Sequence, residues 1–111
     1  MPVRTASGYA DLNFVLDSGA DLTMLPASVA DFLGISLDGS REVRVTGVEG
    51  PGAMAKVGEL TVRIGDRDYA IPCAFSTNEN TPFLLGRLGL FRHFNVTFDN
   101  RRRKIALESI T

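Results

Sequence analysis

The sequence predicts a single, mostly β domain, and two observations support this. The chain has 111 residues, of which 44% are hydrophobic and 23% are charged, which fits one globular domain with its own core and is too short for two. Its apolar residues fall mostly in short strand-like runs separated by glycine, proline, aspartate and asparagine. Since no repeat or linker divides the chain, we expect residues 1–111 to form one domain.

The N-terminal third of the chain predicts a hairpin followed by a short helix. Residues 3–5 and 11–16 are strand-like and flank a Ser-Gly pair at residues 7–8, where we expect the turn of a first hairpin. Residues 26–33 have the pattern of a helix, and Gly34 is placed to end it.

Two further strand-like runs, residues 41–46 and 54–64, flank a glycine-rich separator at residues 47–52. The separator holds three glycines and one proline, so its backbone could bend away from a binding site and close over it. The same composition is typical of an ordinary flexible hairpin tip. Glycine content alone favours neither interpretation.

The C-terminal half continues the β pattern. We expect a turn at residues 65–68, a strand at 69–76, a polar loop at 77–81, a short helix at 88–91, and closing strands at 95–98 and 104–107. The basic run at residues 101–104 lies between the closing strands. It could be a basic patch, but it fits a solvated hairpin turn better.

One acidic residue directly follows an apolar run and enters a turn of small residues. The segment is Phe14-Val15-Leu16-Asp17-Ser18-Gly19-Ala20-Asp21. It resembles the active-site loop of an aspartic peptidase, in which a carboxylate must approach a second carboxylate closely enough to share a proton and a water. Small neighbours allow the tight bend this requires, and a hydroxyl after the acid can hydrogen-bond the backbone across the site. The plain structural alternative is an Asp-Ser-Gly turn after a strand.

A second apolar run that ends in glycine, residues 83–87, strengthens the catalytic interpretation. The acid loop, the glycine-rich separator and this Gly-Arg segment, in that order, resemble the retropepsin family, the single-lobe aspartic peptidases of retroviruses and their cellular and bacterial relatives. The ending at residues 91–99 is similar to a lobe of the two-lobed pepsin-like enzymes, which favours a cellular or bacterial relative over a viral one.

The resemblance implies a fold and an assembly. The fold would be an all-β, closed retropepsin-like acid-protease barrel with one or two short helices. The chain holds a single Asp-Ser-Gly, whereas the chemistry needs two facing carboxylates, so we expect a C2 homodimer in which Asp17 of each chain supplies half of the site. Only sixteen residues precede Asp17. The N-terminal strand that viral enzymes contribute to their dimer sheet is therefore expected to be short or differently placed.

The resemblance also implies roles for individual residues. Asp17, Ser18 and Gly19 would be catalytic, residues 47–52 would form a flap, and Asp21 would pair with Arg87 beneath the site and brace the dimer, unless the two are unrelated surface charges. The implied substrate-binding positions are Val15, Ala20, Asp21, Leu22, Met24, Gly47, Val48, Gly50, Pro82 and Leu84. They imply a preference for apolar residues near the cut, although Val15 and Leu84 could equally be core.

Composition argues against several other classes of function. Twelve basic and thirteen acidic residues leave a formal charge of −1, so no nucleic-acid partner is expected. No apolar run approaches the roughly twenty residues of a membrane span, and no signal-peptide pattern is present, so we expect a cytoplasmic protein without a membrane segment. The single cysteine, Cys73, lies in an apolar stretch and is interpreted as a buried, inert thiol. The expected chemistry requires neither a metal nor another cofactor.

These observations lead to one functional hypothesis and one alternative. The hypothesis is an aspartic endopeptidase, active as a homodimer, that hydrolyses polypeptides with a water activated between two Asp17 carboxylates. The alternative is a non-catalytic dimerisation or peptide-binding module that keeps the retropepsin fold. The intact Asp-Ser-Gly argues against that alternative.

Overall fold

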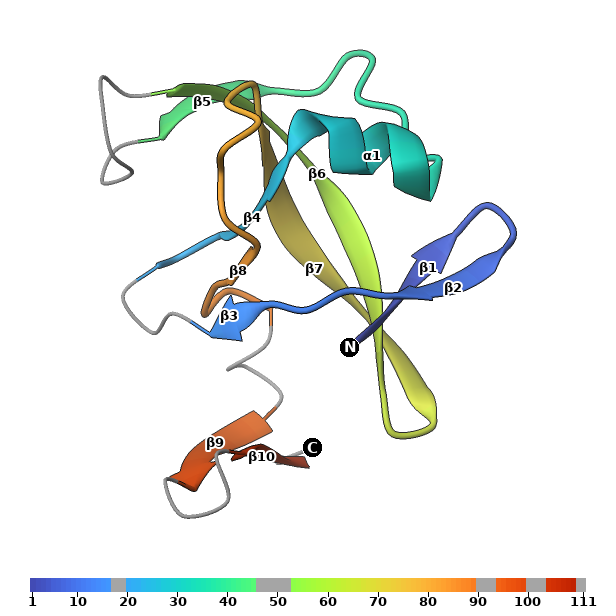
Figure 1. The fold of residues 1–111 in the computed structure, drawn as a ribbon, viewed down its shortest axis with the longest axis vertical. Helices are drawn as coiled ribbons and strands as arrows, with labels where there is room; N and C mark the ends of the chain where they lie inside the picture. The colour runs from blue at the N-terminus through green and yellow to red at the C-terminus, as the bar shows by residue number, and fades with distance from the viewer. Residues whose placement is uncertain (17–19, 46–52, 90–93, 100–103, 110–111) are drawn as a thin grey trace.

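The computed structural model describes residues 1–16, 20–45, 53–89, 94–99 and 104–109. Its elements in chain order are β1 (Pro2–Thr5), β2 (Gly8–Asp11), β3 (Val15–Leu16), β4 (Thr23–Pro26), α1 (Ala27–Leu33), β5 (Glu42–Val45), β6 (Ala53–Ile64), β7 (Arg67–Ser76), β8 (Leu84–Leu85), β9 (Phe94–Asp99) and β10 (Lys104–Ser109). The mostly β prediction is confirmed (Figure 1).

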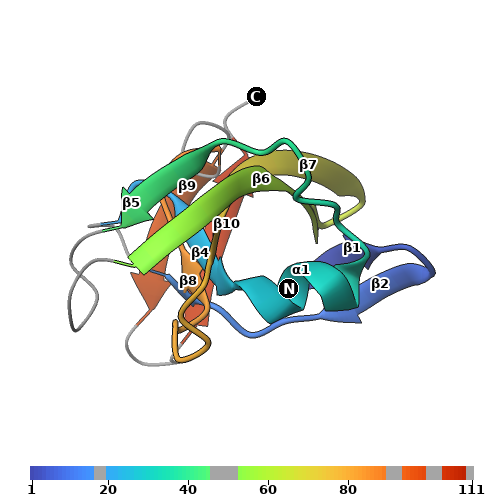
Figure 2. The ribbon, with the colours of Figure 1, turned by 90° about the horizontal axis from the view of Figure 1, so that it is seen from above.

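Eight strands form one strongly curled sheet around the long β6–β7 hairpin (Figure 2). The strand order is β2-β1-β6-β7-β4-β8-β3, and β5 pairs with β6 beside β1. Two of the pairs are parallel, β3 with β8 and β4 with β7. β9 and β10 form a separate two-stranded sheet. The described strands therefore make a curled half-barrel, and its closure into a barrel stays a prediction.

Alternating side chains sort the central strands into two apolar clusters on opposite faces of the sheet. The main core holds alternate residues of the central strands, such as Leu25, Phe75 and Leu85, and α1 covers it with Ala30 and Leu33. In the same strands, the residue directly before each of these, such as Met24 before Leu25, faces the opposite side of the sheet. These residues form a smaller cluster that we call the second cluster, made of Leu22, Met24, Val43, Ala55, Ala74 and Leu84.

The predicted helix and its end are confirmed. Pro26 is extended, with φ −62° and ψ 149°, and α1 begins directly after it. Gly34 adopts the left-handed conformation at φ 74°. Its N–H donates to the Asp31 carbonyl, and the Ile35 N–H donates to the Ala30 carbonyl at 2.9 Å. These bonds satisfy carbonyls that the end of a helix would otherwise leave unpaired.

The prediction of one strand over residues 11–16 is wrong. β2 pairs with β1 from Gly8 to Asp11, so the hairpin turn lies at residues 6–7 rather than 7–8. After Leu12, whose N–H donates to the Met1 carbonyl at 3.0 Å, the chain leaves β1. It forms β3 only where it reaches β8, because the partner strand decides where an extended segment becomes a strand.

Two other turns also differ from expectation. The turn predicted at residues 65–68 is shorter, since β7 begins at Arg67 and pairs with Ile64. Gly65, at φ 66°, supplies the positive φ that a two-residue hairpin turn requires. Of the helix predicted at residues 88–91, Leu88 and Gly89 form a turn, and the other two residues lie outside the described part of the chain.

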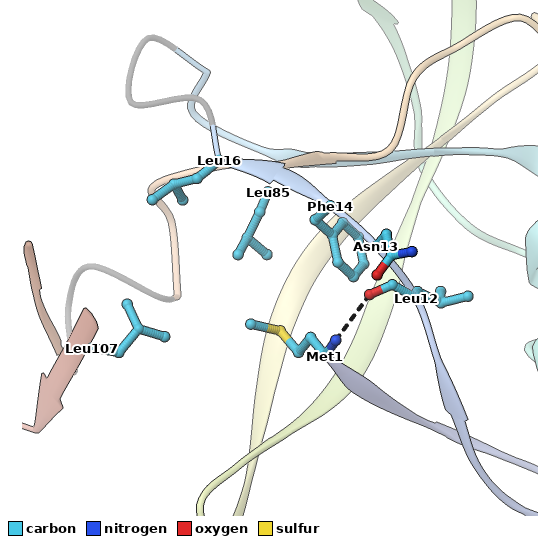
Figure 3. A pocket seen from close by; sticks show the side chains of 7 residues that line it. All are labelled: Met1, Leu12, Asn13, Phe14, Leu16, Leu85 and Leu107. Atoms are coloured by element: carbon cyan, nitrogen blue, oxygen red, sulfur yellow. Dashed lines mark hydrogen bonds between the residues drawn. The ribbon is translucent and has the colours of Figure 1, made fainter. Parts of the chain in front are cut away.

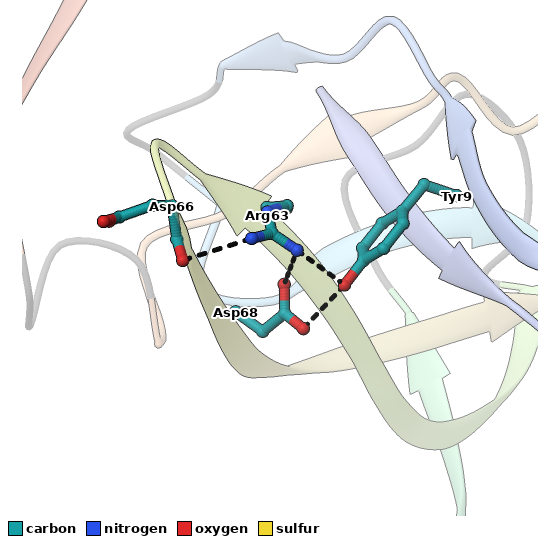
Figure 4. A network of polar contacts seen from close by, with 4 residues as sticks. All are labelled: Tyr9, Arg63, Asp66 and Asp68. Carbon is teal, nitrogen blue, oxygen red and sulfur yellow. Dashed lines mark hydrogen bonds and ion pairs between the residues drawn. The ribbon is translucent and has the colours of Figure 1, made fainter.

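An exposed polar network joins the β1–β2 hairpin to the β6–β7 hairpin (Figure 4). The Tyr9 hydroxyl donates to Oδ2 of Asp68 at 2.7 Å and accepts from Nη1 of Arg63 at 3.2 Å. The Arg63 guanidinium also lies 5.4 Å from the centre of the Tyr9 ring, within range of a cation–π interaction.

Candidate active site

The three predicted catalytic residues, Asp17, Ser18 and Gly19, lie outside the described residues. The strands before and after them both pair with β8. β3 pairs with β8 in parallel, Val15 beside Leu84 and Leu16 beside Leu85, and the Val15 N–H donates to the Phe83 carbonyl at 2.8 Å. β4 pairs with β8 on its other edge through Met24 and Leu84. β8 thus lies between the strand that leads into residue 17 and the strand that follows residue 19.

Gly86 allows the segment after β8 to cross the chain that follows the acid loop. A Cβ atom at this position would lie 2.4 Å from the Leu22 carbonyl carbon and 2.8 Å from the Thr23 amide nitrogen. No side chain fits at these separations, because both neighbours are backbone atoms. The backbone contact therefore explains why glycine stands at this point of the predicted Gly-Arg segment.

Three hydrogen bonds hold this crossing together. The Gly86 N–H donates to the buried Thr23 hydroxyl at 3.1 Å. The N–H groups of Arg87 and Leu88 donate to the Ala20 and Asp21 carbonyls, both at 2.9 Å. Residues 20–23 and 86–88 consequently run side by side and position the chain that continues from Gly19.

Asp21 and Arg87, whose pairing the family resemblance implied, form an ion pair between Oδ1 of Asp21 and Nη2 of Arg87. Their side chains are 67% and 52% exposed. Solvent screens an exposed pair, so its contribution to stability is small. The pair nevertheless adds a side-chain link to the two segments that the backbone bonds already join.

The predicted substrate-binding positions divide by their place in the fold. Leu22, Met24 and Leu84 belong to the second cluster, on the sheet face opposite the main core. Val15, 63% exposed, is the register partner of Leu84 and shares its face. The alternative that Val15 and Leu84 are plain core therefore does not describe Val15. Ala20 is half-buried, whereas Pro82 is exposed. Gly47, Val48 and Gly50 lie outside the described residues.

The second cluster connects the acid-loop strands with the β5–β6 hairpin, whose tip was predicted to be the flap. Val43 of β5 and Ala55 of β6 are register partners, and both belong to the second cluster together with Met24. Figure 1 shows β5, β4, β8 and β3 on the same side of the molecule. An apolar face thus extends from the acid loop to the base of that hairpin.

Comparison with known families decides which family this architecture represents. The sequence model described as "Aspartyl protease" matches residues 1–88. This chain belongs to the aspartyl protease family. The matched residues include the acid loop, the second cluster and the Gly86 crossing.

The fold of this aspartyl protease family member is similar to that of a solved structure. The crystal structure of a retropepsin-like aspartic protease from Rickettsia conorii is similar, with a TM-score of 0.68 and 22% sequence identity. The similarity covers 96% of this chain and 79% of that chain. A search of curated proteins gave no match. In the described part of the chain, no helix has the length and apolar character needed to cross a bilayer.

The sequence argument missed one residue of the candidate site, Thr23. It is fully buried and starts β4, in the otherwise apolar sequence Thr-Met-Leu-Pro. A hydroxyl at the edge of a buried strand needs a hydrogen-bond partner, and this was the available signal. The partner, Gly86, could not be found from the sequence because it is 63 residues away.

Proposed function

We propose that this chain is an aspartic endopeptidase that is active as a homodimer. The observation that carries the proposal is the position of β8 between the two strands that flank residues 17–19. The Thr23–Gly86 hydrogen bond and the family match over residues 1–88 support it. A loop anchored on both sides by strands that pair with β8 can present an acid in a fixed position, as catalysis requires.

Asp17 is the proposed acid. In the dimer its carboxylate lies near Asp17 of the partner subunit, and two close carboxylates cannot easily both ionise, so they retain one proton and titrate as a pair. The ionised member takes a proton from a water, and that water attacks the scissile carbonyl. The protonated member donates to the carbonyl oxygen as negative charge develops on it. No covalent intermediate forms.

Ser18 and Gly19 have supporting roles in this proposal. The Ser18 hydroxyl hydrogen-bonds backbone and stiffens the loop, and the Gly19 backbone bonds to an extended substrate as a neighbouring strand would. The flap at residues 47–52, between β5 and β6, closes over that substrate and excludes water. The Asp21–Arg87 pair braces the dimer beneath the site.

The proposed substrate is an extended polypeptide with apolar side chains near the cut. The sheet face opposite the main core carries the residues that would contact these side chains. Three of them, Leu22, Met24 and Leu84, belong to the second cluster. Val15 shares this face as the register partner of Leu84. Apolar substrate side chains would bury against this face and leave water, which favours binding. The described sheet ends in β2 on one side and in β3 on the other, and these two strands do not pair with each other. Closure of the sheet into a barrel is therefore also part of the proposal.

The decisive experiment is cleavage of an unbiased peptide mixture between about pH 4 and pH 7, where a coupled acid pair can share its proton, with products identified by mass spectrometry. Asp17→Asn is measured beside the wild type. Asp38→Asn is the matched control, because Asp38 is an exposed aspartate in the loop after α1.

We expect cuts between apolar residues in the wild type and in Asp38→Asn, and none in Asp17→Asn. A folded wild-type dimer that binds peptides but cuts none at any pH would overturn the peptidase proposal. That result would favour the binding-module alternative.

A further inference from the structure

The edge of β6 that faces β1 and β5 is interrupted in its middle. β5 pairs with this edge as far as Lys56, and the Val57 N–H then donates to the Arg41 carbonyl at 2.9 Å. In the described part of the chain, β1 pairs with the same edge at Val62 alone. Residues 58–61 therefore have no described strand beside them on this edge, although their other edge pairs with β7.

Backbone groups of Glu59 and Thr61 point into this gap. Along a strand, the N–H and C=O of successive residues point to opposite edges. The Val57 N–H points to the side of β5, so the groups of Glu59 and Thr61 point the same way. Among the described residues, no backbone partner bonds to Glu59 on that side. Such an N–H and C=O take their partner from water or from a ligand.

A cavity of about 220 Å³ lies at the gap. It is bounded by the end of β1, by β6 and by the end of α1. Leu33 and Ile35 give it apolar surface, whereas Arg4, Glu59 and Thr61 give it polar surface. Pockets for drug-sized ligands measure roughly 300 to 1,000 Å³, so this cavity fits a molecule of the size of an amino acid. We call it the Arg4–Glu59 cavity.

Arg4 and Glu59 bring opposite charges to the cavity, and neither charge is neutralised within the described residues. Both side chains are exposed, and neither forms an ion pair or a hydrogen bond with a described side chain. Arg63, on the same face of β6, is in the opposite situation, since it bonds to Tyr9 and pairs with Asp68 (Figure 4). The charges of Arg4 and Glu59 are thus available to a ligand.

Another cavity of the molecule has no comparable polar chemistry. It measures about 240 Å³ and lies beside Leu16 and Leu107 (Figure 3). Apart from Asn13, the side chains that line it are apolar. A lining without charged groups does not select one class of ligand. We call it the Leu16 cavity and use it below as a control site.

We propose that the Arg4–Glu59 cavity binds a free α-amino acid with an apolar side chain, such as leucine. The ligand carboxylate pairs with the Arg4 guanidinium, and the ligand ammonium pairs with the Glu59 carboxylate. The ligand side chain buries against Leu33 and Ile35. A zwitterion of this size carries one group of each charge and one apolar group, which matches the three kinds of surface in the cavity.

The first test titrates leucine into the protein and follows the backbone amide signals by two-dimensional NMR. We expect saturable shifts at Glu59 and Thr61, with a dissociation constant of about 1 mM or below. Leu12 and Leu107 line the Leu16 cavity, and their signals should stay unchanged. Absence of saturable shifts, or shifts at Leu12 and Leu107 alone, would overturn the proposal.

Two analogues test the requirement for both charges. Leucinamide keeps the ammonium group and lacks the carboxylate, whereas isocaproate keeps the carboxylate and lacks the ammonium group. We expect each analogue to bind at least about tenfold more weakly than leucine, because each leaves one charge of the cavity unpaired. Equal affinities for the three compounds would rule out a zwitterion site.

Arg4→Gln and Glu59→Gln assign the two charges separately. Arg4→Gln should lose the preference for leucine over leucinamide and keep the preference over isocaproate, and Glu59→Gln should do the reverse. Both residues are exposed, so the variants should fold. Arg44→Gln and Glu42→Gln are matched controls, because both residues are exposed on β5, outside the cavity. Retention of both preferences in Arg4→Gln and Glu59→Gln would contradict the assignment.

These measurements are independent of the proposed function, since none of them needs cleavage. A protein that binds leucine as described but cuts no peptide would keep this inference and remove the peptidase. A protein that cuts peptides but does not bind leucine would keep the peptidase and remove this inference.

Discussion

Gly86 is the residue whose identity the structure constrains most tightly. The chain that follows the acid loop lies directly against the Gly86 backbone. A Cβ atom on residue 86 would lie 2.4 Å from the Leu22 carbonyl carbon. We expect Gly86→Ala to lower the free energy of unfolding by about 3 kcal/mol or more, because backbone must move to relieve the overlap. The midpoint of urea unfolding measures this effect.

Gly65→Ala is the control for this substitution. Gly65 has a positive φ of 66° and open space where a Cβ would lie. Alanine there brings backbone strain of about 1 kcal/mol without a collision. Equal losses at the two positions would contradict the crossing as the reason for glycine at position 86.

Cys73 is a second residue whose environment makes a measurable difference. Burial raises the pKa of its thiol from the ordinary 9.0 to about 12. The unfolded thiol therefore ionises above about pH 9 while the folded one stays protonated. The unfolded state then binds fewer protons, so the free energy of unfolding falls as the pH rises from about 9 towards 12.

Comparison with Cys73→Ala isolates this contribution from that of other groups that titrate at high pH. Relative to Cys73→Ala, we expect the free energy of unfolding of the wild type to fall by up to about 1.4 kcal/mol per pH unit above pH 9. Urea unfolding at a series of pH values measures both slopes. Parallel slopes would show that the thiol ionises equally easily in both states.

At the scale of elements, Tyr9 links the β1–β2 hairpin to the β6–β7 hairpin through its side chain, in addition to the pairing of β1 with β6. The Tyr9 hydroxyl bonds to Asp68 and Arg63, 59 and 54 residues away. We expect Tyr9→Phe to lower the free energy of unfolding by about 0.5 to 1 kcal/mol, since the bonds are exposed and partly screened. The ring and its contact with Arg63 remain in this variant, so denaturant unfolding reports the hydroxyl alone. No loss in Tyr9→Phe beside a clear loss in Tyr9→Ala would assign the stabilisation to the ring instead.

At the scale of the whole molecule, the proposed site takes one Asp17 from each chain, which would make activity a property of pairs of chains. An Asp17→Asn subunit mixed with wild type would form heterodimers that hold one carboxylate and cannot share a proton between two acids. We expect excess Asp17→Asn to inhibit the wild type after subunits exchange, and Asp38→Asn not to inhibit it. Peptidase activity against the mixing ratio measures this. Undiminished wild-type activity would contradict a shared site.

Prediction from sequence succeeded where local pattern decides structure. The helix, found at Ala27–Leu33, and its end at Gly34 followed from the residue pattern and the capping glycine. The strands β5, β6 and β7 followed from strand-like runs between turn residues. It failed for residues 11–16, where the same apolar run is divided between two partner strands. A strand is defined by what it pairs with, and pairing between distant segments leaves no mark in either segment alone.

The candidate site shows the same division. The sequence by itself determined the apolar run into Asp17, the small residues after it, the single-domain length and the glycine before Arg87, because these depend on residue types and on local backbone freedom. Only the tertiary structure decided that β8 lies between the two strands beside the acid loop, that Thr23 anchors Gly86, and that Leu16 rather than Val15 faces the main core. Curling the sheet brings segments more than sixty residues apart into contact, and a contact depends on geometry that no single segment encodes.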